Sequence, residues 1–175
     1  VNNCYGYEVF LAIKSEFEHD GKKVLAIRED IYNKMVGAHY LQINASGILE
    51  DQIFRMNYLV HQLESEFRPD IILINHPKPL FQYDDKFPFD SGGIGYLLSQ
   101  AVPGDGCVYC SHFTTFDEEF WSRIFQMVQM RFGYPVLGVH MGNIIPDSST
   151  GVGLGTTYIP DIEIIRNIRD TSSVY

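Results

Sequence analysis

Positive charge is scarce in this chain of 175 residues. Thirteen Lys and Arg stand against 22 Asp and Glu, which gives a net charge of −9 and a pI of about 5.0. Binding to nucleic acid or to an anionic membrane surface requires a concentrated basic patch, so we expect neither partner. Long apolar runs are also missing: none approaches the ~18 residues that a membrane-spanning helix needs. No signal peptide is visible, and we expect a cytoplasmic protein.

Cysteine is scarce too, with three in the chain. Cys107 and Cys110 form a C-x-x-C pair, a spacing that occurs in redox sites and in half of a zinc site. The segment around them is typical of a strand, in which residues three apart point to opposite faces. A zinc site would need two more ligands at suitable spacing. We therefore expect reduced structural thiols, no metal and no cofactor.

What the chain does contain is a regular alternation of helical and strand patterns. Apolar residues recur every three or four positions in some segments and form short β-branched runs in others. Such alternation predicts an α/β fold with three layers, a mostly parallel sheet and helices on both faces. The predicted helices cover residues 7–19, 30–35, 46–67, 91–101 and 115–132, and the predicted strands cover 24–27, 70–75, 107–110, 135–139 and 156–159.

Two of these helices carry predicted N-terminal caps, Ser46 for the long helix and a Thr115–Glu118 capping box for the later one. The segment 144–155, before the strand predicted at 156–159, is expected to be a loop. We expect a single domain. Because the chain begins without Met and at a loop, we also expect that it is a fragment lacking upstream residues.

The first loop and the helix after it occupy the place of a phosphate-binding loop. That loop needs the pattern G-x-x-x-x-G-K-[ST], in which glycines, Lys and a hydroxyl hold the phosphates and Mg²⁺. With Gly6 aligned to the second glycine, Tyr7 replaces the Lys and Glu8 replaces the Ser or Thr. Two interpretations stay open: a capped helix start, or a degenerate phosphate loop that includes Asn3 and Gly6.

The strand that ends at Asn75 bears on the same question. In nucleotide hydrolases this strand ends in an acid that helps to hold Mg²⁺, whereas Asn carries no charge and binds magnesium weakly. His76 follows directly and is of a metal-ligand type, although a lone His is more often a hydrogen-bonded loop residue. We assign no catalytic residue.

Other candidate ligand-binding residues follow the ends of the later strands. His112 and His140 fall at strand ends, so with His76 they could line one cleft or converge on a metal. Gly92 and Gly93 open a helix, where they could accept an anion or allow close packing against a strand.

Several segments resemble those of P-loop NTPases in the group of dethiobiotin synthetase and the MinD-like ATPases. GYEVFLAIKSEFEHDGKKVLAI looks like their opening, RPDIILINHP resembles their Walker B strand, and RFGYPVLGVHMGN is similar to a stretch in which Asn143 would match a base-contacting Asn. The departures at Tyr7, Glu8 and Asn75 fall on the catalytic positions. The resemblance therefore implies the fold without hydrolysis.

A narrower resemblance, over residues 3–143, is to the "peptide maturation system" proteins. These accompany radical-SAM enzymes in clusters that modify ribosomally made peptides. The likeness lies in NCYGYEVFLAIKSEF, RPDIILINHPKPL, GGIGYLLSQAV and RFGYPVLGVHMGN. It implies a non-catalytic accessory protein that binds a peptide or its modifying enzyme, with a homodimer left open. The alternatives are an enzyme with a histidine-assisted site at the strand ends, and a sensor domain for a nucleotide or another small ligand.

Overall fold

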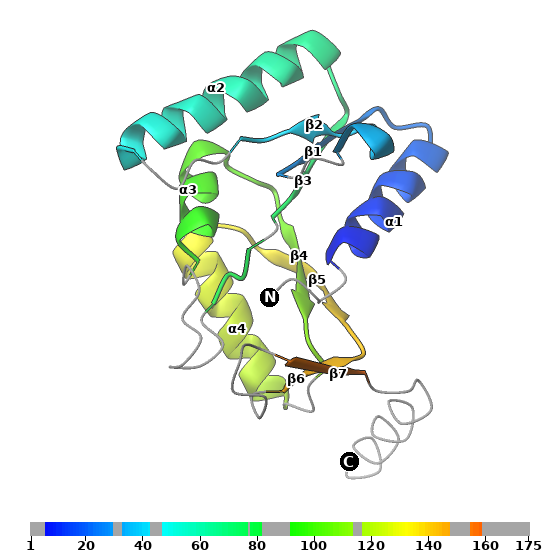
Figure 1. The fold of residues 1–175 in the computed structure, drawn as a ribbon, viewed down its shortest axis with the longest axis vertical. Coiled ribbons are helices and arrows are strands. Elements are labelled where there is room, and N and C mark those ends of the chain that lie inside the picture. Colours follow the sequence, from blue (N-terminus) through cyan, green and yellow to red (C-terminus); the bar gives the residue numbers. More distant parts are fainter. Residues whose placement is uncertain are drawn as a thin grey trace.

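The computed structural model describes residues 6–29, 33–42, 47–76, 78–81, 92–113, 117–147 and 155–158. Within them, helices alternate with mainly parallel strands, which confirms the α/β class (Figure 1). The helices are α1 (Gly6–His19), α2 (Leu49–Phe67), α3 (Gly93–Ala101) and α4 (Glu118–Phe132), with a short 3₁₀ turn, η1 (Asn33–Val36). The strands are β1 (Val24–Arg28), β2 (His39–Tyr40), β3 (Ile71–Asn75), β4 (Cys107–Ser111), β5 (Val136–Met141), β6 (Ile144–Asp147) and β7 (Gly155–Tyr158).

The first sheet has three parallel strands in the order β2-β1-β3. β1 and β3 align over their whole length, from Val24 opposite Ile71 to Arg28 opposite Asn75. On one face, Phe10 of α1 packs against Ala26 in β1, Ala38 just after η1 and Leu73 of β3. The other face is covered by α2 and α3. This sheet is therefore apolar on both faces, as parallel strands between helices usually are.

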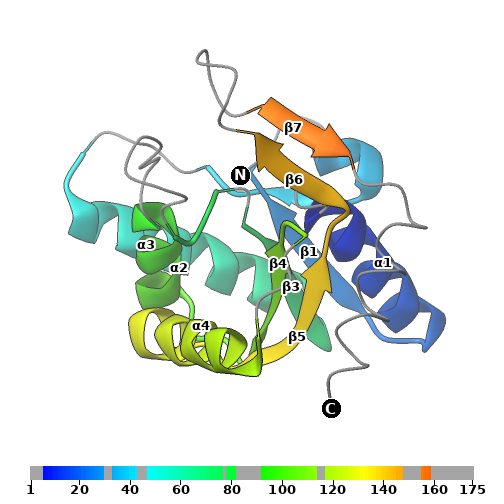
Figure 2. The ribbon, with the colours of Figure 1, turned by 90° about the horizontal axis from the view of Figure 1, so that it is seen from below.

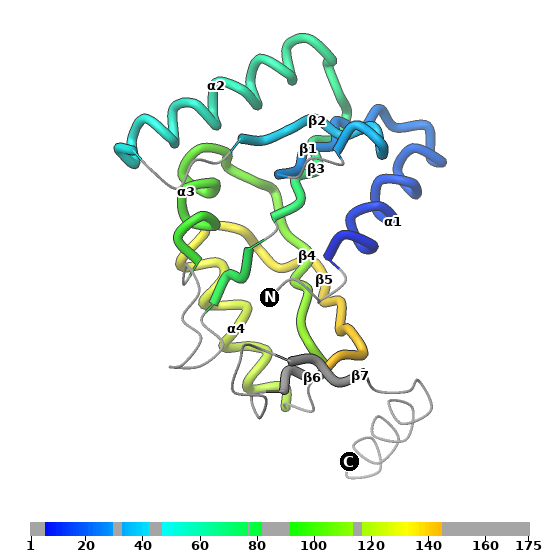
Figure 3. The backbone as a smooth tube through the Cα atoms, viewed as in Figure 1, coloured from blue at the N-terminus to red at the C-terminus, as the bar shows by residue number. Residues whose placement is uncertain are grey.

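The second sheet consists of β4 and β5, which are also parallel. Ile124, Val128 and Phe132 of α4 pack against the side of this sheet that carries Cys107 and Tyr109. α3 lies between α2 and α4, and the Tyr134 hydroxyl donates a 2.8 Å hydrogen bond to the carbonyl of Val102 at the end of α3. Burial raises the pKa of Tyr134 to about 12. The path from α3 into β4 can be followed in Figure 3.

α1 stands apart from the other three helices. α1 packs on the face of β1 that carries Ala26, whereas α2 packs on the face that carries Leu25 and Ile27. Figures 1 and 2 show α1 on one side of the strands and α2, α3 and α4 on the other. Among the described residues, no helix is both long and apolar enough to cross a membrane.

Several expectations are corrected by the structure. α2 begins at Leu49 with Ile48 at the N-cap position and no side-chain cap, so Ser46, which lies outside the described residues, is not its cap. The α4 cap is Asp117, whose carboxylate accepts a 2.9 Å hydrogen bond from the Phe120 amide, and not the Thr115 capping box. Asp117 directly precedes Glu118, the first residue of the helix, so it occupies the position from which a side chain reaches a free amide of the first turn.

Two strands were not anticipated. β2 contains only two residues, too few to show the alternation of apolar and polar residues that predicts a strand. β6 pairs with β7 as an antiparallel hairpin in a segment that was expected to be a loop. The described strands therefore form two small parallel sheets and one hairpin, and not one continuous sheet.

Candidate functional site

The start of α1 meets the carboxyl ends of β3 and β4, and these three elements form the rim that we consider as the site. The Asn75 side-chain amide donates a 3.2 Å hydrogen bond to the carbonyl of Gly6. A methyl group added at Gly6 would lie 3.8 Å from the sulfur of Cys110. Parallel strands place their carboxyl ends on the same edge of a sheet, which is where ligands bind in open α/β folds.

Tyr7 and Arg28 form the best-defined contact of this rim. The Arg28 guanidinium lies 4.0 Å from the centre of the Tyr7 ring, within the range of a cation–π interaction. Arg28 ends β1, is only 7% exposed and pairs in register with Asn75. Tyr7, Arg28 and Asn75 therefore converge from α1, β1 and β3, around the first turn of α1.

Arg28 is the functional candidate that reasoning from sequence missed. Its signal was a charged residue at the end of an otherwise apolar run, VLAIR, directly after the predicted strand 24–27. Burying a cation costs free energy unless a charge or an aromatic face compensates for its lost hydration. At Arg28 the ring of Tyr7 supplies an aromatic face.

Glu8 lies in the first turn of α1 and is exposed. An acid there interacts favourably with the helix dipole. At the position of the phosphate-loop hydroxyl it also repels an incoming anion, because like charges within ~4 Å in partly screened surroundings cost several kcal/mol. Asn3 lies outside the described residues, and its predicted role remains a prediction.

His76 and the two glycines lie together on the α3 side of the first sheet. The His76 Nδ1 donates a 2.8 Å hydrogen bond to the Lys78 carbonyl. Gly92 has a φ of 78°, and a methyl group added to it would lie 2.2 Å from the carbonyl oxygen of Leu80. Around Gly93 nothing lies within 4 Å of such a methyl group. Close packing thus accounts for Gly92, and the open surroundings of Gly93 leave its anion-binding role a prediction.

His112 and Asn143 lie at the far end of the second sheet. His112 follows β4, and burial lowers the pKa of its imidazole, partly offset by a backbone hydrogen bond with Ile144. Two backbone hydrogen bonds hold the chain around it. The Gly142 amide donates to the Ser111 carbonyl at 2.8 Å, and the Phe113 amide donates to the Ile144 carbonyl at 3.1 Å. Asn143 is partly buried between these two links.

The three histidines do not converge in the described part of the chain. His76 lies beside α3, His112 adjoins β6, and His140 lies within β5, where it pairs in register with Cys110 of β4. No group of three or more potential metal ligands of the His, Cys, Asp and Glu types occurs among the described residues. Cys107 and Cys110 also point to opposite faces of β4, one toward α4 and the other toward Gly6.

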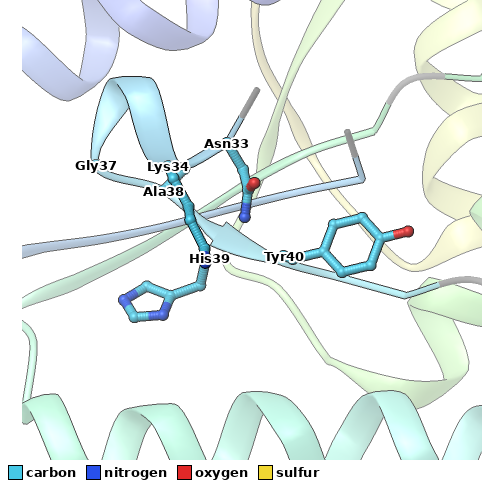
Figure 4. A pocket seen from close by; sticks show the side chains of 6 residues that line it. All are labelled: Asn33, Lys34, Gly37, Ala38, His39 and Tyr40. Carbon is cyan, nitrogen blue, oxygen red and sulfur yellow. The ribbon is translucent and has the colours of Figure 1, made fainter. Parts of the chain in front are cut away.

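A shallow depression of about 380 Å³ lies beside β2, at the outer edge of the first sheet (Figure 4). Its lining is formed by η1, the turn after it and β2, with the residues Asn33, Lys34, Gly37, Ala38, His39 and Tyr40. It is open to solvent, and none of the candidate residues predicted from the sequence lines it. We therefore place the site at the start of α1.

Comparison of the chain with protein-family models, with curated proteins and with solved structures found no match in any of the three.

Proposed function

We propose that this chain is a non-catalytic, P-loop-like accessory protein that assists the maturation of a ribosomally made peptide by binding the peptide or its modifying enzyme. The family assignment comes from the sequence resemblance. The non-catalytic part of the proposal rests on the contacts that Tyr7 and Asn75 make. Tyr7 lies on Arg28 and Asn75 is hydrogen-bonded to Gly6, so both positions that would hold phosphate and Mg²⁺ are engaged with the protein itself.

The fold that accompanies this proposal is a three-layer, P-loop-like domain with one largely parallel sheet. Its support is the placement of helices on both faces of the first sheet and the common orientation of the strands in each parallel sheet. In such a domain the start of α1 would be the former phosphate loop. Glu8 in its first turn adds repulsion toward a triphosphate.

A binding role is supported by an apolar surface on the second sheet. Along β5 the exposed residues alternate with half-buried ones, and the exposed ones are Leu137, Val139 and Met141. We term these exposed apolar residues along β5, together with Val108 of the neighbouring β4, the β5 strip. Leu137 is 73% exposed. Grouped exposed apolar side chains mark protein or peptide contacts, and Met adapts readily to varied partners.

The nucleotide part of the proposal is tested by titration calorimetry with ATP and GTP in the presence of Mg²⁺. We expect no heat of binding up to millimolar nucleotide and no release of phosphate. Micromolar binding with measurable turnover would contradict it, because a degenerate loop without Lys, hydroxyl and acid cannot support that chemistry.

The binding part is tested with the precursor peptide and the modifying enzyme encoded beside the gene. We expect the chain to bind one of them, and Leu137→Glu to weaken that binding at least about tenfold, since it places a charge in a desolvated contact. Met130→Glu is the matched control, because Met130 is 88% exposed on α4, outside the β5 strip. Equal loss in both variants, or no binding to either partner, would contradict the proposal.

A sensor for a small anionic ligand is the second candidate, and Arg28 is the observation that favours it. Its guanidinium is buried at the rim beside the first turn of α1, where backbone amides also favour negative charge. A thermal-shift panel of nucleotides and anionic metabolites tests this role. A ligand present at ~100 times its dissociation constant adds about 2.7 kcal/mol of stability. The shift should be absent in Arg28→Met.

A further inference from the structure

The depression beside β2 has the chemistry of a binding site that the proposed function does not use. Its volume is about 380 Å³, and its lining comes from η1, the turn after η1 and β2 (Figure 4). No acid occurs among its six lining residues, although the chain as a whole carries a net charge of −9. This part of the surface therefore differs in charge from the rest of the molecule.

The side chain of Asn33 is the first observation that points to a ligand. Asn33 is only 5% exposed, and its carboxamide makes no hydrogen bond with any residue that the structure describes. Figure 4 shows the carboxamide directed from η1 toward β2, where it lines the depression. A buried amide loses hydration that it must replace, so its partner has to come from the depression, as water or as a ligand.

The turn from η1 into β2 holds Asn33 in this place through its backbone. Gly37 has a φ of 66°, a left-handed conformation that glycine adopts without strain, and the Ala38 amide donates a 2.9 Å hydrogen bond to the Asn33 carbonyl. A methyl group added at Gly37 would meet no atom within 4 Å, so the depression is open at this turn. The main chain of Asn33 thus serves the fold, and its carboxamide is left for binding.

The outer edge of β2 supplies further hydrogen-bonding groups. In the described part of the chain β2 pairs with β1 alone, and the Leu41 amide donates a 2.8 Å hydrogen bond to the Arg28 carbonyl of β1. Backbone groups of successive residues point to opposite sides of a strand, so the amide and carbonyl of Tyr40 point away from β1. Neither group has a hydrogen bond among the described residues. Such an edge is a template for another extended chain.

Lys34 supplies positive charge to the depression. It is exposed and makes no ion pair with a described residue. His39 instead lies edge-on against the ring of Phe67 in α2, with ring centroids 4.7 Å apart. Lys34 is therefore the one permanently charged side chain of the lining, and a carboxylate is the complementary group in a peptide.

We propose that the depression and the outer edge of β2 form a binding site for an extended peptide segment that carries an acidic side chain. The segment adds as a strand beside β2 and bonds to the amide and carbonyl of Tyr40. Its acidic side chain enters the depression, where the Asn33 carboxamide and the Lys34 ammonium hold the carboxylate. The choice of a peptide as the occupant rests on the proposed function, whereas the β5 strip and the start of α1 have no part in this site.

NMR titration of the isotope-labelled protein tests the site with a defined probe, the blocked pentapeptide acetyl-Thr-Val-Glu-Val-Thr-amide. We expect the amide signals of Tyr40 and its neighbours to shift, with a Kd on the order of 1 mM, because the probe gains few hydrogen bonds and one ion pair. The same peptide with Gln in place of Glu should bind about threefold more weakly, since an exposed ion pair contributes modestly.

Two variants of the protein test the individual side chains. Asn33→Ala should weaken binding of the probe at least about threefold, through the lost hydrogen bond. It should not lower the midpoint of urea unfolding, because the carboxamide has no protein partner to lose; a lower midpoint would indicate a structural role instead. Lys34→Gln should abolish the preference for the Glu peptide, whereas Lys22→Gln, at another exposed lysine, is the matched control and should keep it.

The proposal is overturned if the Tyr40 amide is unchanged at about 10 mM probe, if the Glu and Gln peptides bind equally, or if Asn33→Ala binds as well as the original protein. These outcomes are separable from those of the proposed function. If the precursor peptide or its enzyme binds and Leu137→Glu weakens that binding, while no peptide shifts Tyr40, this site alone fails. If the probe binds as described and neither of those partners does, the maturation role alone fails.

Discussion

The guanidinium of Arg28 lies 4.0 Å from the centre of the Tyr7 ring, so the end of β1 and the first turn of α1 are joined by a cation on an aromatic face. Tyr7 stands where a phosphate-binding loop would have its lysine. A lysine at this position would place a second cation against a buried arginine. The tyrosine instead covers Arg28 with an uncharged aromatic ring. The residue type at position 7 is therefore tied to the buried arginine that ends β1.

Removal of the Tyr7 ring should destabilise the protein. We expect Tyr7→Ala to lower the free energy of unfolding by about 1–3 kcal/mol, through lost apolar burial and a lost cation–π contact. Tyr7→Phe keeps the ring face and should change it by less than about 0.5 kcal/mol. Urea denaturation monitored by circular dichroism measures both. Tyr58→Ala, at a position 70% exposed on α2, is the control and should be near neutral. Equal losses at the two tyrosines would show that the Arg28 contact contributes nothing.

An acid introduced at the end of β3 should not create nucleotide binding. Asn75→Asp replaces an amide that donates to the Gly6 carbonyl with a group that only accepts, so two oxygens would face each other. We expect a loss of about 1–2 kcal/mol in the free energy of unfolding and no Mg²⁺-dependent ATP binding by calorimetry. Asn75→Ala, the control, should lose about 0.5–1.5 kcal/mol. A gain of Mg²⁺-dependent binding in Asn75→Asp would show that the rim still holds a nucleotide site.

The two adjacent glycines before α3 should respond in opposite ways. Gly92→Ala forces a side chain into a left-handed conformation and against the carbonyl of Leu80, so we expect a loss of at least about 2 kcal/mol. Gly93→Ala meets no atom within 4 Å and lies in a helix, so stability should stay within about 0.5 kcal/mol or rise. Thermal unfolding of the pair measures the difference. Similar losses in both would contradict the packing role of Gly92.

Stability should fall in mild acid because of His112. Burial lowers the pKa of its imidazole in the folded protein, so the unfolded chain binds the proton more tightly. The free energy of unfolding is therefore unaffected above the unfolded value near 6.5, and it decreases as the pH falls from there toward the lowered folded pKa. His112→Gln should flatten the slope between pH 7 and pH 5 in urea titrations. An identical slope in His112→Gln would contradict this prediction.

The elements that the sequence predicted well have strong local signals. The spacing of Met56, Val60 and Leu63 predicted the buried face of α2, and Ile124, Val128 and Phe132 predicted that of α4. These residues are confirmed as core, because a 3-4 rhythm over several turns leaves only one face that can be buried. The bounds of the five predicted strands were correct to within one or two residues, because each is a short run of strand-forming residues bounded by turn-forming or polar ones.

The parts that were missed depend on distant partners. β2 has two residues and exists because Ile27 and Arg28 of β1 pair with it. β6 is a strand because β7 returns to pair with it, which no local pattern in residues 144–147 signals. The candidate site shows the same division: Tyr7, Glu8 and Asn75 were selected by alignment to a motif, whereas Arg28 became a candidate only through its contact with Tyr7.

The sequence by itself determined the α/β class, the order of the main helices and strands, and the residue types, tyrosine and glutamate, at positions 7 and 8. These follow from periodicity and from residue identity, which are local properties. Only the tertiary structure decided that Arg28, Tyr7 and Asn75 meet, that His76, His112 and His140 do not, and that α1 covers the face opposite α2. Those are matters of sheet pairing and connection handedness, which join residues far apart in the chain and so leave no local pattern in it.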